Sequence, residues 1–340
     1  MHRIFTNKDQ IQLGRELDKA FPEGISYEDA AEYWYNPPLS TTMSSLKRVA
    51  LWCPGNGDTS VIDAICLTLL TFPEELYVFF SSNTDVDDFE RKVEGLGRDL
   101  PGIHLLSVVG THEERLKALS DNPPDHIIVY GSDQVCRTVL GHVDPLTPRT
   151  VYGSKTSVLV HNDNTDSTKL AELVYLDVTQ GGGNGCLNPS ILYMRGDQAT
   201  EEFLEKLQSF YPSEVVERKF LSEAFKRGSE DLLLTSPRGH IIVRRPIEST
   251  PEPPTSGIGG GTLMVVNCGR EDPVDVMLQE WGQSSQYLSS IGCRKTDLRL
   301  YKSGATRIVR FGRMQEPTYR WTHDGVPLVP QTYKLIGEDR

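Results

Sequence analysis

The sequence predicts an α/β protein made of two doubly wound lobes with mostly parallel sheets. Two observations support this class. Short runs rich in β-branched and aromatic residues alternate with helical stretches along most of the chain. A glycine-rich loop, residues 181–185, interrupts this series near its middle and leads into Cys186. Strands separated by helices form βαβ units with parallel strands, and helices on both faces make a sheet doubly wound.

The first part of the chain contains most of the expected βαβ units. Strands are expected at residues 47–54, 76–80, 103–109, 126–130 and 157–161. Helices are expected after them at residues 60–71, 85–96, 113–120, 133–140 and 168–178. Each strand is short and apolar, as strands buried on both faces are.

The alternation continues after Cys186 and predicts a second lobe. Strands are expected at residues 191–194, 231–234, 241–243, 262–267 and 306–310. Helices are expected at residues 200–210 and 274–281, where apolar residues recur at helical spacing. Proline and glycine between residues 249 and 261 indicate a loop. Cys186 therefore lies at the seam of the two predicted lobes, where ligands usually bind.

Composition excludes several classes of function. The 340 residues include 38% hydrophobic residues, and no apolar run reaches the length of a membrane span. Residues 1–7 lack a signal-peptide core, so a cytoplasmic location is expected. The six cysteines form no CxxC pair and no metal-ligand spacing, which predicts reduced thiols and no metal site. The net charge of −12 argues against binding to nucleic acid.

Cys186 is the cysteine best placed for chemistry. Glycines before it let another molecule approach the backbone closely, and backbone N–H groups of such a loop can stabilise an oxyanion. This pattern suits a nucleophile with its own oxyanion hole. The alternative is a surface loop that happens to precede a strand with a cysteine. The other five cysteines are expected to be structural, because free cysteines usually belong to the core.

Four passages, in order along the chain, carry a resemblance to a known family. They are residues 49–56, ending in Gly55-Asn56; residues 125–133, with Gly131-Ser132; the Cys186 loop with Leu187-Asn188-Pro189; and residues 307–314 with 321–325. Together they resemble the aldehyde dehydrogenase superfamily, and within it the LuxC-like acyl-CoA reductases, over residues 45–335.

The resemblance implies a reduction of an acyl thioester, either acyl-CoA or an acyl-carrier protein, to an aldehyde. Cys186 would carry the acyl group, Asn56 would stabilise the oxyanion, and His323 would transfer a proton. NADPH or NADH would lie at Gly131, Ser132, Gly182 and Gly183. Each assignment has a structural alternative: Asn56 is a common turn residue, Asp133 can stabilise a helix dipole, and a lone histidine is often structural.

The implied domains are an extension at residues 1–45, a cofactor-binding domain at 46–183, a catalytic domain at 184–310, and a tail at 311–340 that packs back on the cofactor lobe. A partner enzyme that supplies or consumes the acyl group is compatible with this reaction. The short extension suggests a trimmed member of the family that is monomeric or assembles differently, so the oligomeric state stays open.

Two departures from the family pattern keep other functions open. Phe79-Phe80 stands where the family has a lysine near the adenosine ribose, which leaves the choice between NAD and NADP undecided. Residues 151–155 lack the glutamate base of hydrolytic aldehyde dehydrogenases, which suits a thioester reductase. The alternatives are an acyl transferase or thioesterase that has lost hydride transfer, and a non-catalytic partner subunit with the same fold.

Overall fold

The computed structural model divides into two compact units. Unit 1 comprises Met1–Gly153 and Pro317–Arg340, and unit 2 comprises Ser154–Glu316. The structure describes residues 4–22, 25–34, 42–54, 58–80, 102–163, 166–180, 187–210, 231–235, 241–246, 263–320, 322 and 333–336. The units divide between residues 153 and 154, whereas the sequence suggested a domain boundary at 183/184. The division comes earlier because the strand at Thr156–Val160 and the helix at Ser167–Thr179 belong to the sheet and core of unit 2.

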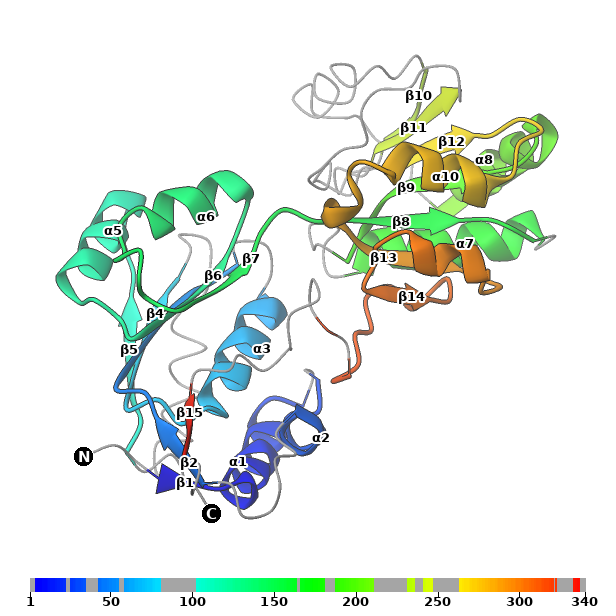
Figure 1. The fold of residues 1–340 in the computed structure, drawn as a ribbon. Helices are drawn as coiled ribbons and strands as arrows, with labels where there is room; N and C mark the ends of the chain where they lie inside the picture. The colour runs from blue at the N-terminus through cyan, green and yellow to red at the C-terminus, as the bar shows by residue number, and fades with distance from the viewer. Residues whose placement is uncertain are drawn as a thin grey trace. The chain divides into compact units, whose positions relative to one another are not determined.

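Unit 1 is built on a five-stranded parallel sheet with the order β5-β4-β3-β6-β7. Its strands are β3 (Arg48–Trp52), β4 (Glu75–Phe79), β5 (His104–Val108), β6 (His126–Tyr130) and β7 (Arg149–Tyr152). Its helices are α3 (Asp58–Leu69), α5 (His112–Asp121) and α6 (Asp133–Leu140). Helix α3 covers one face of the sheet, and α5 and α6 cover the other (Figure 1). This is the doubly wound arrangement that the sequence predicted.

The two ends of the chain meet in a small antiparallel sheet of unit 1. Strand β2 (Thr42–Ser45) pairs with β1 (Ile4–Phe5) on one side and with β15 (Tyr333–Ile336) on the other. Helices α1 (Asn7–Ala20) and α2 (Tyr27–Trp34) complete the N-terminal segment, for which the sequence suggested no elements. The Trp34 indole donates a hydrogen bond to the carbonyl of Tyr319, 2.6 Å away. The C-terminal segment is thus part of the same unit as the N-terminal extension.

Unit 2 is built on a seven-stranded sheet with the order β10-β11-β12-β9-β8-β13-β14. Its strands are β8 (Thr156–Val160), β9 (Pro189–Met194), β10 (Asp231–Thr235), β11 (Ile241–Pro246), β12 (Leu263–Asn267), β13 (Leu288–Cys293) and β14 (Arg307–Val309). Its helical elements are α7 (Ser167–Thr179), α8 (Asp197–Phe210), α10 (Pro273–Trp281), and the short 3-10 helices η2 (Ser285–Tyr287) and η3 (Leu298–Lys302). All pairs are parallel except β10 with β11.

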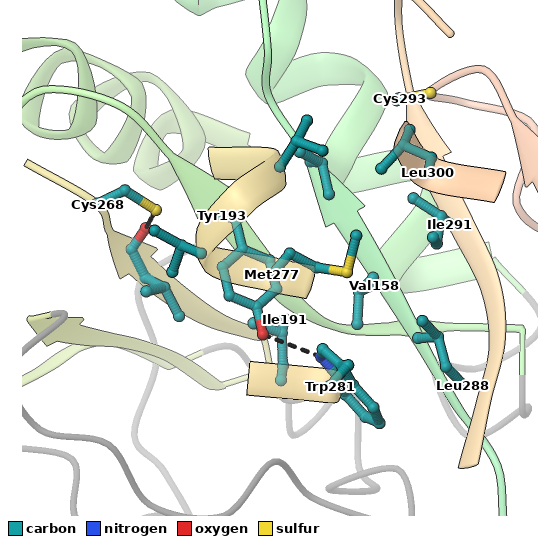
Figure 2. Close-up of a cluster of buried hydrophobic side chains, with 14 of the residues drawn as sticks. Val158, Ile191, Tyr193, Cys268, Met277, Trp281, Leu288, Ile291, Cys293 and Leu300 are labelled. Carbon is teal, nitrogen blue, oxygen red and sulfur yellow. Dashed lines mark hydrogen bonds between the residues drawn. The ribbon is translucent and has the colours of Figure 1, made fainter. Parts of the chain in front are cut away.

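Alternate residues of the central strands of unit 2 pack into two hydrophobic cores, one on each face of the sheet. On β9, Ile191 and Tyr193 pack under α10, whereas Leu192 and Met194 face α7 and α8. Because side chains alternate along a strand, a strand that is apolar at every position can bury both faces. Figure 2 shows the α10 side, where the Trp281 indole donates to the Tyr193 hydroxyl at 3.0 Å.

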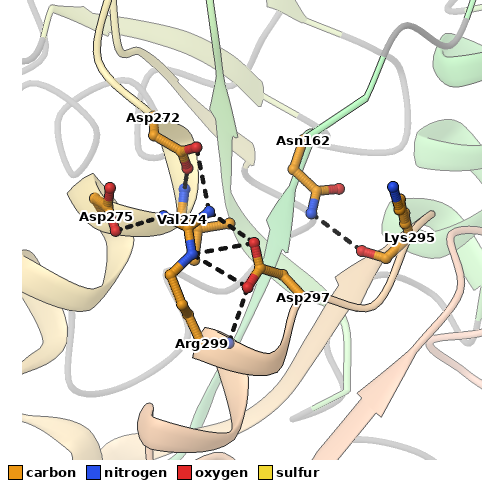
Figure 3. Close-up of polar contacts among 7 residues, drawn as sticks. All are labelled: Asn162, Asp272, Val274, Asp275, Lys295, Asp297 and Arg299. Atoms are coloured by element: carbon orange, nitrogen blue, oxygen red, sulfur yellow. Dashed lines mark hydrogen bonds and ion pairs between the residues drawn. The ribbon is translucent and has the colours of Figure 1, made fainter.

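A charged cluster ties two helix starts together on the α10 side of unit 2. The Arg299 guanidinium contacts the carboxylates of Asp297, Asp275 and Asp272 at 2.6, 2.7 and 3.2 Å (Figure 3). Asp272 caps α10 by accepting the N–H of Val274, and Asp297 caps η3 by accepting the N–H of Arg299 itself. The hydrogen bonds from Arg299 lower the pKa of Asp297.

Several sequence expectations need correction or fall outside the described residues. Strand β13 was not expected, and Cys293, which the sequence placed in a polar connection, ends this buried strand. Leu-Ser-Ser-Ile-Gly-Cys has too few β-branched residues to stand out as a strand, yet β8 and β14 enclose it on both sides. The helix expected at 85–96 lies outside the described residues. Among the described helices, none is long and apolar enough to cross a membrane.

Candidate functional site

The structure describes two parts of the predicted site, and each belongs to a different unit. In unit 1 it describes Gly131 and Ser132. In unit 2 it describes both flanks of the loop that carries the predicted nucleophile. The residues Cys186, Asn56, His323, Gly182 and Gly183 themselves lie outside the described residues, so their roles stay predictions.

Gly131 and Ser132 lie at the topological switch point of the unit 1 sheet. They connect the end of β6 to the start of α6. Strand β3 has β4 on one side and β6 on the other, so the connections leave β3 and β6 in opposite directions. In open α/β sheets, ligands bind at the carboxyl edge of the strands at such a point. The sheet topology therefore brings Gly131 and Ser132 to the edge where a dinucleotide is expected.

Ser132 caps α6 at the carboxyl edge of the sheet. Its Oγ accepts a hydrogen bond from the N–H of Val135 at 3.3 Å. The first N–H groups of a helix lack partners within the helix and carry partial positive charge, which favours an anion. The negative charge of the Asp133 carboxylate, in the first turn of α6, would repel an anion at the same place. Asp133 also lies close to Gly153, where an added Cβ would be 2.8 Å from its Oδ1.

The glycine at position 131 is required by the protein's own helix. A Cβ built on Gly131 would lie 2.9 Å from Cγ1 and 3.1 Å from Cβ of Val135. Such contacts are too close for any side chain, so the glycine allows β6 and α6 to pack closely. A substitution at Gly131 would disturb α6 itself, and it is therefore a poor test of cofactor binding.

Arg115 is a residue of this edge that the sequence analysis missed. It lies on α5, is 8% exposed, and donates from Nη1 to the carbonyl oxygen of Phe80 at 2.6 Å, just beyond β4. Its Nε is buried without a hydrogen-bond partner within the described part of the chain. The signal in the sequence was its spacing: Arg115 precedes Leu119 by four residues and so shares the apolar face of α5.

In unit 2, Asn188 joins the two flanks of the loop that carries Cys186. Its buried amide Nδ2 lies 3.0, 3.1 and 3.0 Å from the carbonyl oxygens of Asp177, Val178 and Gln180. The last carbonyls of a helix lack partners within the helix, and here one side chain from beyond the loop satisfies them. The start of β9 is thereby attached to the end of α7.

Asp177 links the same end of α7 to the segment after β14. Its two carboxylate oxygens accept the N–H groups of Gly312 and Met314 at 2.7 and 2.8 Å. Gly312 has a φ of 78°, a left-handed conformation that glycine adopts readily. Burial raises the pKa of Asp177 to about 6 in spite of these two hydrogen bonds. Asn188 and Asp177 together fix the end of α7 from two directions.

The other cysteines are poor nucleophiles. All five of the described cysteines are buried and free of disulfides, as expected of cysteines in a core. Burial raises the pKa of Cys136 and of Cys293 to about 11, and it also raises the pKa of Cys53 and Cys66. Because the thiolate is the reactive form, the raised pKa values of these four thiols disfavour a role as nucleophile near neutral pH. Within the described residues, no group of acidic, histidine or cysteine side chains could hold a metal ion.

Comparison with family models decides the family. The model of the acyl-CoA reductases (LuxC) matches residues 31–212, which is more than half of the chain. The chain belongs to this family. The matched residues of the LuxC-family chain include both the sheet of unit 1 and the loop around Cys186. No curated protein matches the chain by sequence.

Solved structures show that the LuxC-family chain has the aldehyde dehydrogenase fold. A protein from Burkholderia cenocepacia assigned as an aldehyde dehydrogenase has a TM-score of 0.63 at 15% identity, over 90% of this chain and 78% of that one. A protein from Sinorhizobium meliloti 1021 assigned as a methylmalonate-semialdehyde dehydrogenase, in complex with NAD, has a TM-score of 0.65 at 12% identity, over 97% and 84%.

A structure of proline utilization A with proline bound in remote sites reaches a TM-score of 0.71 at 10% identity, over 97% of this chain. The LuxC-family chain covers only 42% of the length of that protein. At these identities the likeness concerns the fold alone.

Proposed function

We propose that this LuxC-family chain reduces an acyl thioester to an aldehyde with NADPH or NADH, and that Cys186 carries the acyl group during the reaction. The observation that carries the proposal is the match to the acyl-CoA reductase family over residues 31–212, which spans the predicted nucleophile. The burial of the five described cysteines supports Cys186 as the nucleophile. The acyl donor would be acyl-CoA or an acyl-carrier protein in the cytoplasm.

The proposed reaction begins at the Cys186 sulfur. Its thiolate attacks the thioester carbonyl, the bond from carbon to the donor sulfur breaks, and the donor leaves as a thiol after taking up a proton. The backbone N–H of Cys186 and the amide of Asn56 would stabilise the oxyanion, and loss of one such donor typically costs about 100- to 1,000-fold in rate. The product of this half-reaction is an acyl-cysteine.

The second half-reaction reduces that acyl-cysteine. A bound nicotinamide would supply the hydride. The thiohemiacetal on Cys186 then collapses: the carbon–sulfur bond breaks, the aldehyde leaves, and the thiolate is restored. His323 is a candidate for moving the proton of the departing group.

The residues that would hold the dinucleotide lie at the switch point of unit 1. Gly131, Ser132 and the start of α6 would bind its pyrophosphate. The orphaned Nε of buried Arg115 at the same sheet edge fits an anionic ligand. Gly182 and Gly183 remain further candidates for cofactor binding on the resemblance alone, and they lie outside the described residues.

The test is the intact mass of the protein after incubation with an acyl-CoA, with and without NADPH. We expect an adduct of one acyl group that NADPH discharges. Cys186→Ala should abolish the adduct, whereas the control Cys293→Ala should keep it, because Cys293 is buried with a raised pKa. An adduct on the Cys186→Ala protein at unchanged stoichiometry would overturn the assignment of the nucleophile.

The same experiment separates the alternatives. An adduct that forms but is insensitive to both NADPH and NADH would indicate an acyl transferase or thioesterase. A complete lack of adduct with both acyl-CoA and acyl-carrier protein would indicate a non-catalytic subunit with the same fold.

A further inference from the structure

The carboxyl end of β4 holds a buried cation in an aromatic setting. The Arg115 guanidinium carbon lies 4.9 Å from the centroid of the Trp52 ring, and Nη1 is held by the Phe80 carbonyl. The Trp52 ring in turn stacks on Phe79 at 5.4 Å and meets the edge of His112 at 5.5 Å. Three elements therefore position this one side chain: the ends of β3 and β4, and the first turns of α5.

Among the described residues, no carboxylate pairs with the charge of Arg115. The contacts of its guanidinium there are the Phe80 carbonyl and the Trp52 ring. Its Nε has no hydrogen-bond partner in the described part of the chain, and burial lowers its pKa. A buried unpaired cation is costly to a fold, and an anionic ligand would offset that cost. Such a group is expected at a binding site rather than in a core.

The place of Arg115 in the sheet indicates which anion it meets. Strand β4 is the neighbour of β3 on the side away from β6, so Arg115 lies beyond the pyrophosphate position at α6. In dinucleotide-binding sheets the end of this second strand reads the adenosine ribose: a carboxylate binds the 2′-hydroxyl of NAD, whereas an arginine accommodates the 2′-phosphate of NADP. Residues 81–84, which follow β4 in sequence, are Ser, Ser, Asn and Thr, with no carboxylate before Asp85.

We propose that Arg115 binds the 2′-phosphate of NADPH and thereby sets the choice of cofactor. The guanidinium presents several N–H donors in a planar fork that matches a phosphate group. The inference rests on the proposed function only in that the chain binds a nicotinamide dinucleotide.

The test is equilibrium binding, measured without turnover. Calorimetry would compare 2′,5′-ADP with 5′-AMP, and nicotinamide fluorescence would compare NADPH with NADH. For the wild-type protein we expect the 2′-phosphate to tighten binding about 10- to 100-fold, as a hydrogen-bonded charge pair does. Arg115→Gln should bring this ratio close to one by weakening NADPH, with the affinity for NADH changed less than about threefold.

Two further variants separate the effect of the Arg115 guanidinium from a general effect of charge. Lys117→Gln removes the same charge from the exposed face of the same helix and should leave the ratio unchanged. Arg115→Lys keeps the charge without the planar fork and should retain part of the preference. A wild-type protein that binds NADPH and NADH equally well would overturn the inference even if Arg115→Gln fails to fold. So would a folded Arg115→Gln protein that keeps the wild-type ratio. A wild-type protein that binds neither cofactor would instead overturn the proposed reductase function.

Discussion

At the scale of single residues, two buried polar side chains of the LuxC-family chain bind the backbone in opposite senses: Asn188 donates hydrogen bonds to it and Asp177 accepts them. Asn188 is a neutral amide that satisfies carbonyls at the end of α7. Asp177 accepts two backbone N–H groups, yet its pKa rises to about 6 because desolvation outweighs them. Its carboxylate also lies near the C-terminus of α7, where the helix dipole disfavours negative charge. Asp177 therefore stabilises the fold best in its protonated form.

This assignment predicts how stability depends on pH. The pKa of Asp177 is about 6 in the folded protein and about 3.9 when unfolded, so the folded state binds the proton more tightly. Its contribution to stability is full below about pH 4 and is lost as the pH rises to and beyond 6. Relative to Asp177→Asn, the wild-type free energy of unfolding should fall by about 2 kcal/mol between pH 4 and 7.

Urea titrations of both proteins across this pH range would measure the difference. Asp163→Asn serves as the control, because the Asp163 side chain is 21% exposed whereas Asp177 is fully buried. A free-energy difference between wild type and Asp177→Asn that stays constant from pH 4 to 7 would contradict the assignment.

At the scale of elements, helix ends decide how the functional segments are attached. The start of α6 is capped by Ser132 at the switch point of unit 1, whereas the end of α7 is capped by an amide from the start of β9. Gly292 on β13 shows how closely elements pack in unit 2: a Cβ there would lie 2.3 Å from Leu159 Cδ2. The loop with Cys186 thus begins and ends on a closely packed framework.

Removal of the Asn188 amide should affect both stability and chemistry. Asn188→Ala removes the amide donor from the carbonyls of Asp177, Val178 and Gln180, of which Asp177 keeps the Gln315 amide, and this should lower the free energy of unfolding by about 1–3 kcal/mol. It should also slow acylation of Cys186, because the loop loses the bond between its flanks. Asn162→Ala removes a single hydrogen bond, to the Lys295 carbonyl, and should have the smaller effect on both quantities.

Urea denaturation would measure the free energy, and the rate of adduct formation by mass spectrometry would measure the chemistry. Acylation of Asn188→Ala at the wild-type rate would show that the amide serves stability alone.

At the scale of the whole molecule, the chain joins two large sheets with separate cores, and the described residues proposed to bind the cofactor belong to unit 1. A ligand that binds only the folded state stabilises it by about 2.7 kcal/mol at one hundred times its dissociation constant. Saturating NADPH should therefore slow hydrogen exchange most in peptides that contain the ends of β3, β4 and β6. Protection confined to peptides of β9–β13 would contradict the placement of the cofactor.

The sequence by itself determined the parallel strands, the helices between them, and the position of Cys186 between α7 and β9. Strand and helix periodicities are local, so an apolar run such as Ile191–Met194 can be recognised as a strand without knowledge of the strands that pair with it. It also carried the motifs that placed the chain in its family, since short motifs in order survive when overall identity is low.

The tertiary structure alone decided which segments share a sheet edge and which polar groups are buried. Strand β13 is a strand because β8 and β14 enclose it, and its own residues barely favour that state. Arg115 follows β4 by more than thirty residues in sequence, yet its guanidinium lies at the end of that strand. Contacts of this kind depend on how the helices pack across the sheet, and no local pattern of residues records that packing.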